Sequence, residues 1–301
     1  MPHQTNKMKI IVTGSLGNIS KPLTKELIEK GHQVTLISSK PERKKDIEAL
    51  GAKAAIGSVY DVAFLTETFT GADAVYCMIP PNHFGEPDVI AYFRKVGDAY
   101  GQAISQSGVK RVVDLSSYGA DLEEGTGLIV GAYHAEKIFD QLEAVTLTHI
   151  RPVYFYYNLL GAVNRIKKEG IIAANYGADK VLMVSPIDIA DAVAEELVTP
   201  SGSKVRYVSS DALTGDEIAH ILGEALGKPD LKWVLISDEQ TQQNYEAVGL
   251  APHLARELTE MFAALRTGKL EADYQQNKPK TPGKIKFATF AKDFAAAYNQ
   301  L

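Results

Sequence analysis

The chain has 301 residues, a formal net charge of −5, and a composition of 45% hydrophobic and 23% charged residues. Such a composition is typical of globular proteins, so it excludes disorder as the main state of the chain. The acidic balance and the lack of a long run of lysine or arginine argue against nucleic acid as a partner, because a phosphate backbone needs a basic face.

Strand and helix patterns alternate through the first half of the chain. Apolar residues at helical spacing, such as Ile19, Leu23 and Leu27, predict helices between short apolar strands. The expected strands are residues 9–13, 34–38, 53–56, 74–79, 111–115 and 145–150, and the expected helices are residues 17–30, 42–50, 62–69, 87–106 and 130–143. This alternation predicts an α/β fold with a doubly wound, Rossmann-type parallel sheet, and places ligands at the carboxyl ends of its strands.

The rhythm of the sequence changes after Pro152. The expected helices there are residues 154–168, 187–198, 214–226, 239–248, 252–266 and 289–298, and the expected strands are residues 181–185, 205–208 and 233–236. We therefore predict a Rossmann domain over residues 8–152 and a smaller C-terminal α/β lobe over residues 153–301. Some segments of this lobe are expected to return to the main sheet.

A glycine-containing turn follows the first predicted strand directly. It has the sequence Gly14-Ser15-Leu16-Gly17-Asn18-Ile19. Glycine lets the backbone turn tightly and approach a pyrophosphate, and the helix that follows points its free N–H groups at the phosphates. Because the turn lies between a strand and a helix of a βαβ unit, we predict that these six residues bind a dinucleotide.

The turn and several later motifs resemble one family. The segment Val12-Thr13-Gly14-Ser15-Leu16-Gly17 is similar to the fingerprint of the atypical short-chain dehydrogenases, specifically the NmrA-like branch. The later motifs that agree in order and spacing are Gly71-Ala72-Asp73-Ala74-Val75, Val112-Val113-Asp114-Leu115-Ser116-Ser117, Gly119-Ala120, Ile150-Arg151-Pro152, Phe155, Asn158, Asp188-Ile189-Ala190 and Gly215-Asp216-Glu217-Ile218-Ala219. The resemblance spans nearly the whole chain and implies an NAD(P)-binding domain followed by a substrate lobe.

Two positions depart from the pattern of that family. Ser20 stands where the family usually has a third glycine, which predicts a slightly wider gap between helix and strand. Ser58 stands where an acidic residue often contacts the adenine side, and we expect the backbone of residues 57–59 to line that part of the site.

The end of the second predicted strand selects the nucleotide. An NAD enzyme of this fold usually places Asp or Glu there to bond the ribose hydroxyls. This chain instead has Ser38, Ser39 and Lys40, with Arg43 one turn further on. Hydroxyl groups and cations bind a 2′-phosphate, whereas a carboxylate would repel it. We therefore predict that the cofactor is NADP(H) in preference to NAD(H).

Two interpretations of the catalytic residues remain open. Tyr133 and Lys137 have the i, i+4 spacing of a proton-donating tyrosine and its lysine, and Ser116 or Ser117 ends the preceding strand. When the chain is aligned on its Arg-Pro motif, however, the lysine expected of such a pair falls near residues 132–133. In that register the pair Glu136-Lys137 is similar to that of the NmrA-like quinone reductases, which lack the catalytic dyad.

The remaining candidate residues surround the expected cleft. For the cofactor they are Ser58, Met78, Ile79, Pro80, Ser116, Lys137, Pro152 and Tyr154, in addition to the turn and the selector residues above. For the substrate they are His83, Phe155, Tyr156 and Asn158. The aromatic run at residues 154–157 suits a flat apolar ring such as a quinone.

These observations favour an NADPH-dependent oxidoreductase of the NmrA-like type that acts on a quinone or a small carbonyl compound. One alternative is a non-catalytic NAD(P)-sensing regulator that binds a partner protein. Another is an extended-type sugar-nucleotide epimerase or reductase, which needs Tyr133 and Lys137 as a true dyad.

Other features of the sequence exclude whole classes of site. The single cysteine, Cys77, excludes an intramolecular disulfide, and no set of residues has metal-ligand spacing, so we expect no metal. No segment reaches the ~18 apolar residues that span a bilayer. Residues 1–7 are polar and lead straight into a strand, so we expect no signal peptide and a soluble, cytoplasmic protein without a membrane partner.

Overall fold

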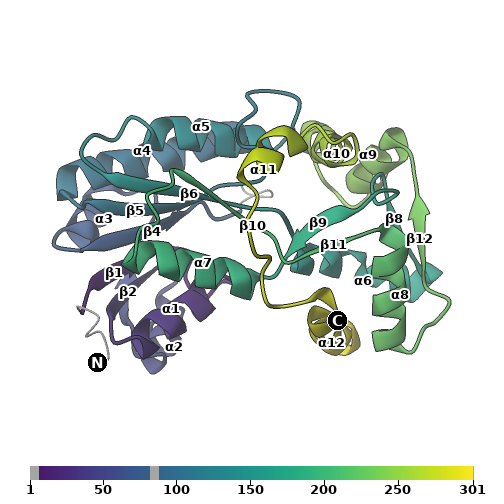
Figure 1. The fold of residues 1–301 in the computed structure, drawn as a ribbon, viewed down its shortest axis with the longest axis horizontal. Coiled ribbons are helices and arrows are strands. Elements are labelled where there is room, and N and C mark those ends of the chain that lie inside the picture. The colour runs from purple at the N-terminus through teal and green to yellow at the C-terminus, as the bar shows by residue number, and fades with distance from the viewer. Residues whose placement is uncertain (1–6, 82–87, 301) are drawn as a thin grey trace.

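The computed structural model describes residues 7–81 and 88–300. Its main sheet has seven strands in the order β10-β6-β5-β4-β1-β2-β3, and every neighbouring pair is parallel (Figure 1). The strands are β1 (Lys9–Val12), β2 (Gln33–Ser38), β3 (Lys53–Ile56), β4 (Ala74–Met78), β5 (Arg111–Leu115), β6 (Thr146–Pro152) and β10 (Val205–Val208). This arrangement confirms the predicted Rossmann-type α/β fold.

Helices cover both faces of the main sheet. One face carries α1 (Ser20–Glu29), α2 (Lys44–Ala49) and α7 (Pro186–Val198), and the other carries α3 (Val62–Phe69), α4 (Val89–Ser107) and α5 (Ile129–Phe139) (Figure 1). Strand β4 is inaccessible to solvent from Ala74 to Cys77, as expected of a parallel strand buried on both faces. The turns at the carboxyl ends of β1, β2 and β4 carry the predicted nucleotide-binding residues.

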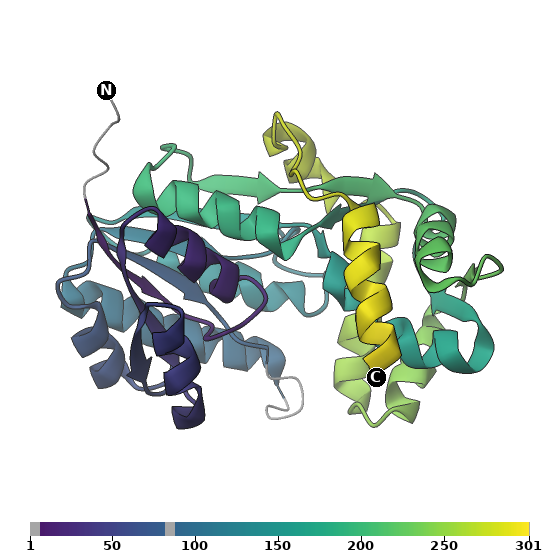
Figure 2. The same ribbon diagram turned by 90° about the horizontal axis from the view of Figure 1, so that it is seen from below.

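The second half of the chain builds two small sheets and a helical cover. The strands are β7 (Tyr154–Phe155), β9 (Val181–Val184) and β11 (Asp211–Leu213) in one sheet, and β8 (Ile171–Ala174) and β12 (Lys232–Leu235) in the other. The helices are α6 (Val163–Glu169), α8 (Gly215–Leu226), α9 (Asp238–Ala247), α10 (Pro252–Arg266), α11 (Glu271–Asn277) and α12 (Phe287–Gln300). Figure 2 shows α12 beside this half, away from the main sheet, where Phe287 and Phe294 enter the core of the lobe.

Several elements differ from the sequence prediction. The helix predicted over residues 154–168 begins as β7, continues as a 3₁₀ helix (Tyr156–Ala162) and becomes α-helical only in α6. Strands β8 and β11 and helix α11 were not predicted. β7 and β11 have only two and three residues and exist because they pair with β9. A segment of that length is too short to show the alternation that predicts a strand.

Two segments of the second half are joined to the first half directly. β10 pairs with β6 over four residues, and α7 packs on the face that holds α1. In addition, the Asp188 carboxylate at the start of α7 accepts hydrogen bonds from the Ser210 hydroxyl and from the backbone N–H groups of Lys284 and Ile285. These hydrogen bonds tie other segments of the second half to α7, and α7 and β10 attach that half to the main sheet.

Candidate functional site

The turn between β1 and α1 has the strained backbone that glycine permits. Gly14 has a φ of 87° and Ser15 a φ of 54°, and the Gly17 N–H donates to the Gly14 carbonyl at 3.2 Å. A Cβ atom at Gly14 would lie 2.5 Å from the Ser20 hydroxyl and 2.9 Å from the Met78 side chain. A glycine is therefore required at this position, because a side chain would collide with α1 and with the end of β4.

One hydrogen bond joins the two sides of this turn. The Ser20 hydroxyl donates to the Thr13 carbonyl at 2.7 Å, so the serine that replaces the family glycine folds back onto the end of β1. The helix begins at Ser20, and its N-cap residue Ile19 provides no side-chain cap. No side chain therefore covers the start of α1, although the Lys21 N–H already donates to the Gly17 carbonyl at 3.0 Å and Pro22 has no N–H, so an anion there would be bound mainly by the turn itself.

The residues predicted to select the nucleotide form one polar cluster. The Ser15 hydroxyl donates to the Ser38 hydroxyl at 2.9 Å, and Arg43 Nη1 donates to the Ser15 hydroxyl at 3.3 Å. Ser38 is buried, whereas Ser39 and Lys40 are exposed beside it. The structure thus brings the β1 turn and the β2 end together around a guanidinium group.

The loop after β3 lies next to this cluster. The Gly57 N–H donates to the Ser38 carbonyl at 3.0 Å, and the Ser58 hydroxyl accepts from the Tyr60 N–H at 3.2 Å. Ser58 is half-buried. Its hydroxyl is used within its own loop, so the loop presents mainly backbone to its surroundings.

The exit of β4 is held by side chains that the sequence analysis missed. Thr13 Oγ1 accepts from the Met78 N–H at 2.8 Å, the Tyr100 hydroxyl donates to the Met78 carbonyl at 2.9 Å, and the Tyr92 hydroxyl donates to the Pro80 carbonyl at 2.8 Å. These contacts fix the predicted cofactor residues 78–80 from beneath. No sequence signal identifies them, because they depend on how α4 packs under the β4 exit.

A buried ionic cluster joins β5, α5 and β6 behind the site. Arg151 binds the Glu136 carboxylate with two hydrogen bonds, from Nε to Oε1 at 2.8 Å and from Nη2 to Oε2 at 2.6 Å. The Ser116 hydroxyl donates to the same Oε1. Arg151 Nη1 also donates to Asp273 at 2.9 Å and to the Tyr207 hydroxyl at 3.2 Å. Burial alone would lower the pKa of Arg151, but the bonds to Glu136 outweigh it and raise that pKa.

The structure places Tyr133 and Lys137 side by side on α5. Lys137 Nζ lies 5.0 Å from the centroid of the Tyr133 ring, and Lys137 is exposed while Tyr133 is half-buried. The ammonium group therefore faces the ring. The Ser117 hydroxyl donates to the neighbouring Tyr118 carbonyl at 3.2 Å, whereas Ser116 points to Glu136.

The four predicted substrate residues have different environments. Phe155 stacks on Tyr157 with ring centroids 5.1 Å apart, and both rings are half-buried. Tyr156 is inaccessible to solvent, and its hydroxyl donates to the Ile285 carbonyl at 3.1 Å, so we assign its ring to the lobe core. Asn158 is exposed, and His83 lies outside the described residues.

The two predicted cofactor residues Pro152, at the end of β6, and Tyr154, at the start of β7, are each held by a hydrogen bond. Pro152 is buried and its carbonyl accepts from the Tyr118 N–H at 3.1 Å. The Tyr154 hydroxyl accepts from the Tyr176 hydroxyl at 2.9 Å, and burial raises the pKa of Tyr154. Burial also raises the pKa of Tyr157 to about 12, so both phenols stay neutral at physiological pH.

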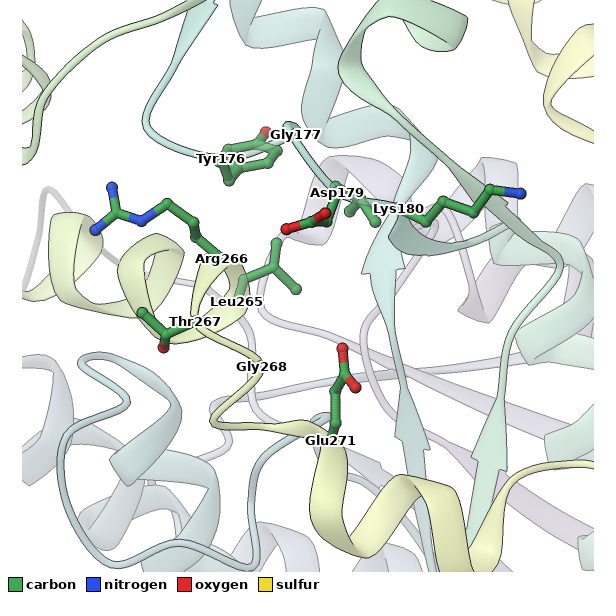
Figure 3. Close-up of a pocket in the computed structure, with 10 residues that line it drawn as sticks. Tyr176, Gly177, Asp179, Lys180, Leu265, Arg266, Thr267, Gly268 and Glu271 are labelled. Atoms are coloured by element: carbon green, nitrogen blue, oxygen red, sulfur yellow. The ribbon is translucent and has the colours of Figure 1, made fainter.

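A separate pocket of about 220 Å³ lies in the second half, between the start of β9 and the turn from α10 to α11 (Figure 3). Its charged lining residues are Asp179, Lys180, Arg266 and Glu271. None of the described candidate residues from the sequence analysis lines it. Across residues 7–81 and 88–300, no group of three or more histidine, cysteine or acidic side chains is arranged to hold a metal ion. Within the same ranges, every helix is too short or too polar to cross a membrane.

Comparison with known proteins points to nucleotide binding. A family model described as NAD(P)H-binding matches residues 14–200. An NAD(P)H azoreductase from Xenophilus azovorans is 26% identical over 294 residues, which cover 96% of this chain and 99% of that protein. The family match confirms the resemblance that the sequence motifs carry.

Solved structures agree on the fold. An NADPH-dependent quinone oxidoreductase from Escherichia coli in complex with NADPH is similar with a TM-score of 0.78 and 19% identity, covering 97% of this chain and 99% of that chain. The triphenylmethane reductase of Citrobacter sp. in complex with NADP(H) has a TM-score of 0.74 and 19% identity, covering 95% of this chain and 99% of that chain.

Proposed function

Because the chain belongs to the NAD(P)H-binding family, we propose that it is an oxidoreductase that transfers hydride from NADPH to a quinone or another small carbonyl acceptor. The observation that carries this proposal is the cluster of Ser15, Ser38 and Arg43 beside the tight glycine turn at Gly14. The turn fits a pyrophosphate because its tight glycine backbone leads from the end of β1 directly into the start of α1, which no side chain caps. The cluster fits a 2′-phosphate because it offers hydroxyl groups and a guanidinium group.

In this proposal the residues of the chain bind the nucleotide and orient the acceptor. The reduced nicotinamide supplies a hydride when bound, and a quinone that receives it takes one proton from water to become the hydroquinone. The N-terminus of α1 and residues 14–19 hold the phosphates, and the fixed β4 exit at residues 78–80 packs beside the nucleotide. The stacked pair Phe155 and Tyr157 supplies a flat apolar surface for the acceptor. Proximity and orientation then carry most of the catalysis.

The test is NADPH oxidation by the pure protein with a panel of quinones, aldehydes and azo dyes. The azo dyes enter the panel because a curated relative is an azoreductase. Turnover of a quinone supports the proposal. If NADPH binds tightly but no acceptor oxidises it, the enzyme proposal is wrong and a sensing role is favoured.

Removal of the Arg43 guanidinium should weaken discrimination between the two coenzymes. Arg43→Ala is expected to raise the Kd for NADPH about tenfold and leave that for NADH within about twofold, because only NADPH carries the phosphate that a guanidinium binds. Titrations of both nucleotides measure the ratio. Lys45→Ala is the matched control, since Lys45 is an exposed cation on α2, which begins directly after Arg43, and lies outside the cluster. A wild-type preference below about fivefold would refute the assignment.

Tyr133→Phe tests whether the phenol is a proton donor. With a quinone as acceptor we expect kcat to change by less than about threefold, because the proton can come from water. Loss of an essential acid would lower kcat by about a hundredfold or more. Such a loss would instead favour the catalytic dyad of an extended-type epimerase or reductase. The fold allows this alternative, because the structure of a nucleoside-diphosphate-sugar epimerase from Staphylococcus aureus is similar to this chain with a TM-score of 0.76.

A further inference from the structure

The C-terminal segment of the chain crosses from the main sheet to the lobe. Helix α11 is bound to the main sheet through Asp273, which accepts a hydrogen bond from Arg151 of β6 at 2.9 Å. The chain then runs past the start of α7 and enters α12, whose first residue, Phe287, is buried in the core of the lobe (Figure 1). Residues 283–287, here called the strap, therefore connect the two halves of the molecule.

A buried carboxylate binds the strap to the start of α7. Asp188 accepts from the Lys284 N–H at 2.8 Å and from the Ile285 N–H at 3.1 Å. The Ser210 hydroxyl donates to the same carboxylate at 2.6 Å. A Cβ atom at Gly283 would lie 2.3 Å from Asp188 Oδ2 and 2.7 Å from the Ser210 hydroxyl oxygen. The strap is therefore fixed to α7 at a point that leaves no room for a side chain.

The strap in turn holds Tyr156. The Tyr156 hydroxyl is shared between the Ile285 carbonyl at 3.1 Å and Asp211 Oδ2 at 3.3 Å. The Phe287 N–H donates to the same Asp211 oxygen at 2.7 Å. The Phe287 ring packs edge-on against the Tyr156 ring, with the centroids 5.2 Å apart. Because Tyr156 is inaccessible to solvent, the strap and Asp211 together fix the position of its side chain.

Tyr156 lies in the sequence between the two residues of the proposed acceptor surface. Phe155 has an extended backbone, with φ −72° and ψ 134°, and successive side chains of an extended segment point to opposite sides. Phe155 and Tyr157 accordingly stack on each other, while Tyr156 enters the lobe core. The anchoring of Tyr156 therefore sets the direction in which the stacked pair faces.

We propose that the strap positions the acceptor-binding surface, with Asp188 and Tyr156 as positioning residues. Asp188 holds the strap, the strap holds Tyr156, and Tyr156 orients Phe155 and Tyr157. This inference rests on the proposed function, because it takes the stacked pair as the surface on which a flat acceptor binds. None of the hydrogen bonds described for the strap reaches a residue proposed to bind the nucleotide. The strap thus acts on the affinity for the acceptor and leaves the affinity for NADPH unchanged.

Gly283→Ala displaces the strap without altering the acceptor surface itself. The new Cβ atom would collide with the buried Asp188 carboxylate, so the strap must move. We expect the Kd for 1,4-naphthoquinone, measured on the NADP+-bound protein by isothermal titration calorimetry, to rise at least about fivefold, because a misoriented surface loses contact with a flat ring. The Kd for NADPH should stay within about twofold. Gly161→Ala is the matched control: a Cβ atom at Gly161 has no neighbour within 4 Å, and both Kd values should equal those of the wild type.

Tyr156→Phe keeps the ring and removes only the hydroxyl that the strap binds. We expect the Kd for the quinone to rise about threefold to tenfold, the loss of one hydrogen bond, with the Kd for NADPH within about twofold. The kcat/KM for the quinone should fall by at least the same factor. Ile218→Val is the control for lost stability, because it shortens a buried side chain in the same lobe core and removes no hydrogen bond of the strap. A merely structural role of Tyr156 would give the result of Ile218→Val.

Two results would overturn the proposal. One is a quinone Kd in Gly283→Ala and Tyr156→Phe that equals the wild-type value. The other is a Kd for NADPH that rises by the same factor as the Kd for the quinone, since the strap would then act on the whole fold. If Gly283→Ala does not fold, the titrations of Tyr156→Phe decide.

Tyr157→Leu distinguishes a failure of the proposed function from a failure of the strap. It removes the flat ring and keeps an apolar side chain, and we expect the Kd for the quinone to rise at least about fivefold. A wild-type Kd in this variant would show that the acceptor binds elsewhere, which overturns the surface and the role of the strap together. If the wild type binds the quinone but does not oxidise NADPH with it, the proposed function is wrong, and the quinone Kd values still decide whether the strap positions the surface.

Discussion

Gly14→Val is expected to raise the Kd for NADPH by at least about a hundredfold. Gly14 has a φ of 87°, a conformation that costs a side chain about 1–2 kcal/mol. The new Cβ atom would lie 2.5 Å from the Ser20 hydroxyl, which cannot retreat without breaking its hydrogen bond to Thr13. The valine would collide with Ser20 and Met78, so the turn that is proposed to hold the pyrophosphate must move. NADPH titration measures the loss, and a thermal melt measures the accompanying destabilisation.

Gly31→Ala is the control for Gly14→Val, because it places a side chain at a positive φ away from the proposed nucleotide site. Gly31 has a φ of 89° after the end of α1, but a Cβ atom there would have no neighbour within 4 Å. We expect this variant to lose stability by about 1 kcal/mol and to bind NADPH with the affinity of the wild type. Equal NADPH affinities of Gly14→Val and wild type would show that the nucleotide binds elsewhere.

The stability of the protein should fall between pH 6.5 and pH 9.5 because of one buried histidine. His149 on β6 lies between two carboxylates, with Nδ1 3.0 Å from Asp114 and Nε2 3.1 Å from Asp140. Both ring nitrogens face carboxylate oxygens, an arrangement that favours the protonated imidazolium. Burial alone would lower the pKa of His149, but the hydrogen bonds to Asp114 and Asp140 raise it to about 9.

The sign of the effect follows from this shift. In the unfolded chain the pKa of a histidine is about 6.5, so folding and protonation support each other. The stabilisation is complete below about pH 6.5 and is lost as the pH rises through about 9. The upper limit for the change is about 3 kcal/mol, given about 1.4 kcal/mol per pKa unit. The hydrogen bonds and the ion pair with Lys204 lower the pKa of Asp140 to about 2, so its own contribution is lost only in acid.

Urea unfolding at pH 6.5 and pH 9.5 measures this contribution. The free energy of unfolding of the wild type should fall by about 2–3 kcal/mol more than that of His149→Gln, which cannot titrate. His220→Gln is the control, because His220 is an exposed histidine on α8 and should leave the pH dependence of the wild type unchanged. A wild type and a His149→Gln variant with the same pH dependence would show that the ring is neutral in the native state.

Most of the main sheet could be predicted from the sequence because its strands are apolar and bounded by helices. The predictions for residues 53–56, 111–115 and 205–208 match β3, β5 and β10 residue by residue. The first helix begins later than predicted, at Ser20, because the Gly17 N–H closes a tight turn on Gly14. Helical periodicity cannot show such a turn, since the same residues fit both conformations.

The candidate site was predictable where topology alone brings residues together. Ser15 and Ser38 meet because parallel neighbours end at one edge of the sheet. The aromatic run shows the limit: Phe155 and Tyr157 stack on each other while Tyr156 lies in the core, and only the pairing of β7 with β9 decides this. The pair of Arg151 with Glu136 is a second such case, because it joins β6 to α5 and no periodicity in the sequence encodes that contact.

The order of the strands in space differs from the order in which they are made. The outer neighbour of β6 is β10, and β7, β8 and β9 are all synthesised before it. Until residues 205–208 leave the ribosome, β6 presents an unpaired edge with free N–H and C=O groups, which is a template for pairing with other chains. The sheet that holds the nucleotide site is thus completed only after much of the second half exists. The two halves must therefore finish folding together instead of one after the other.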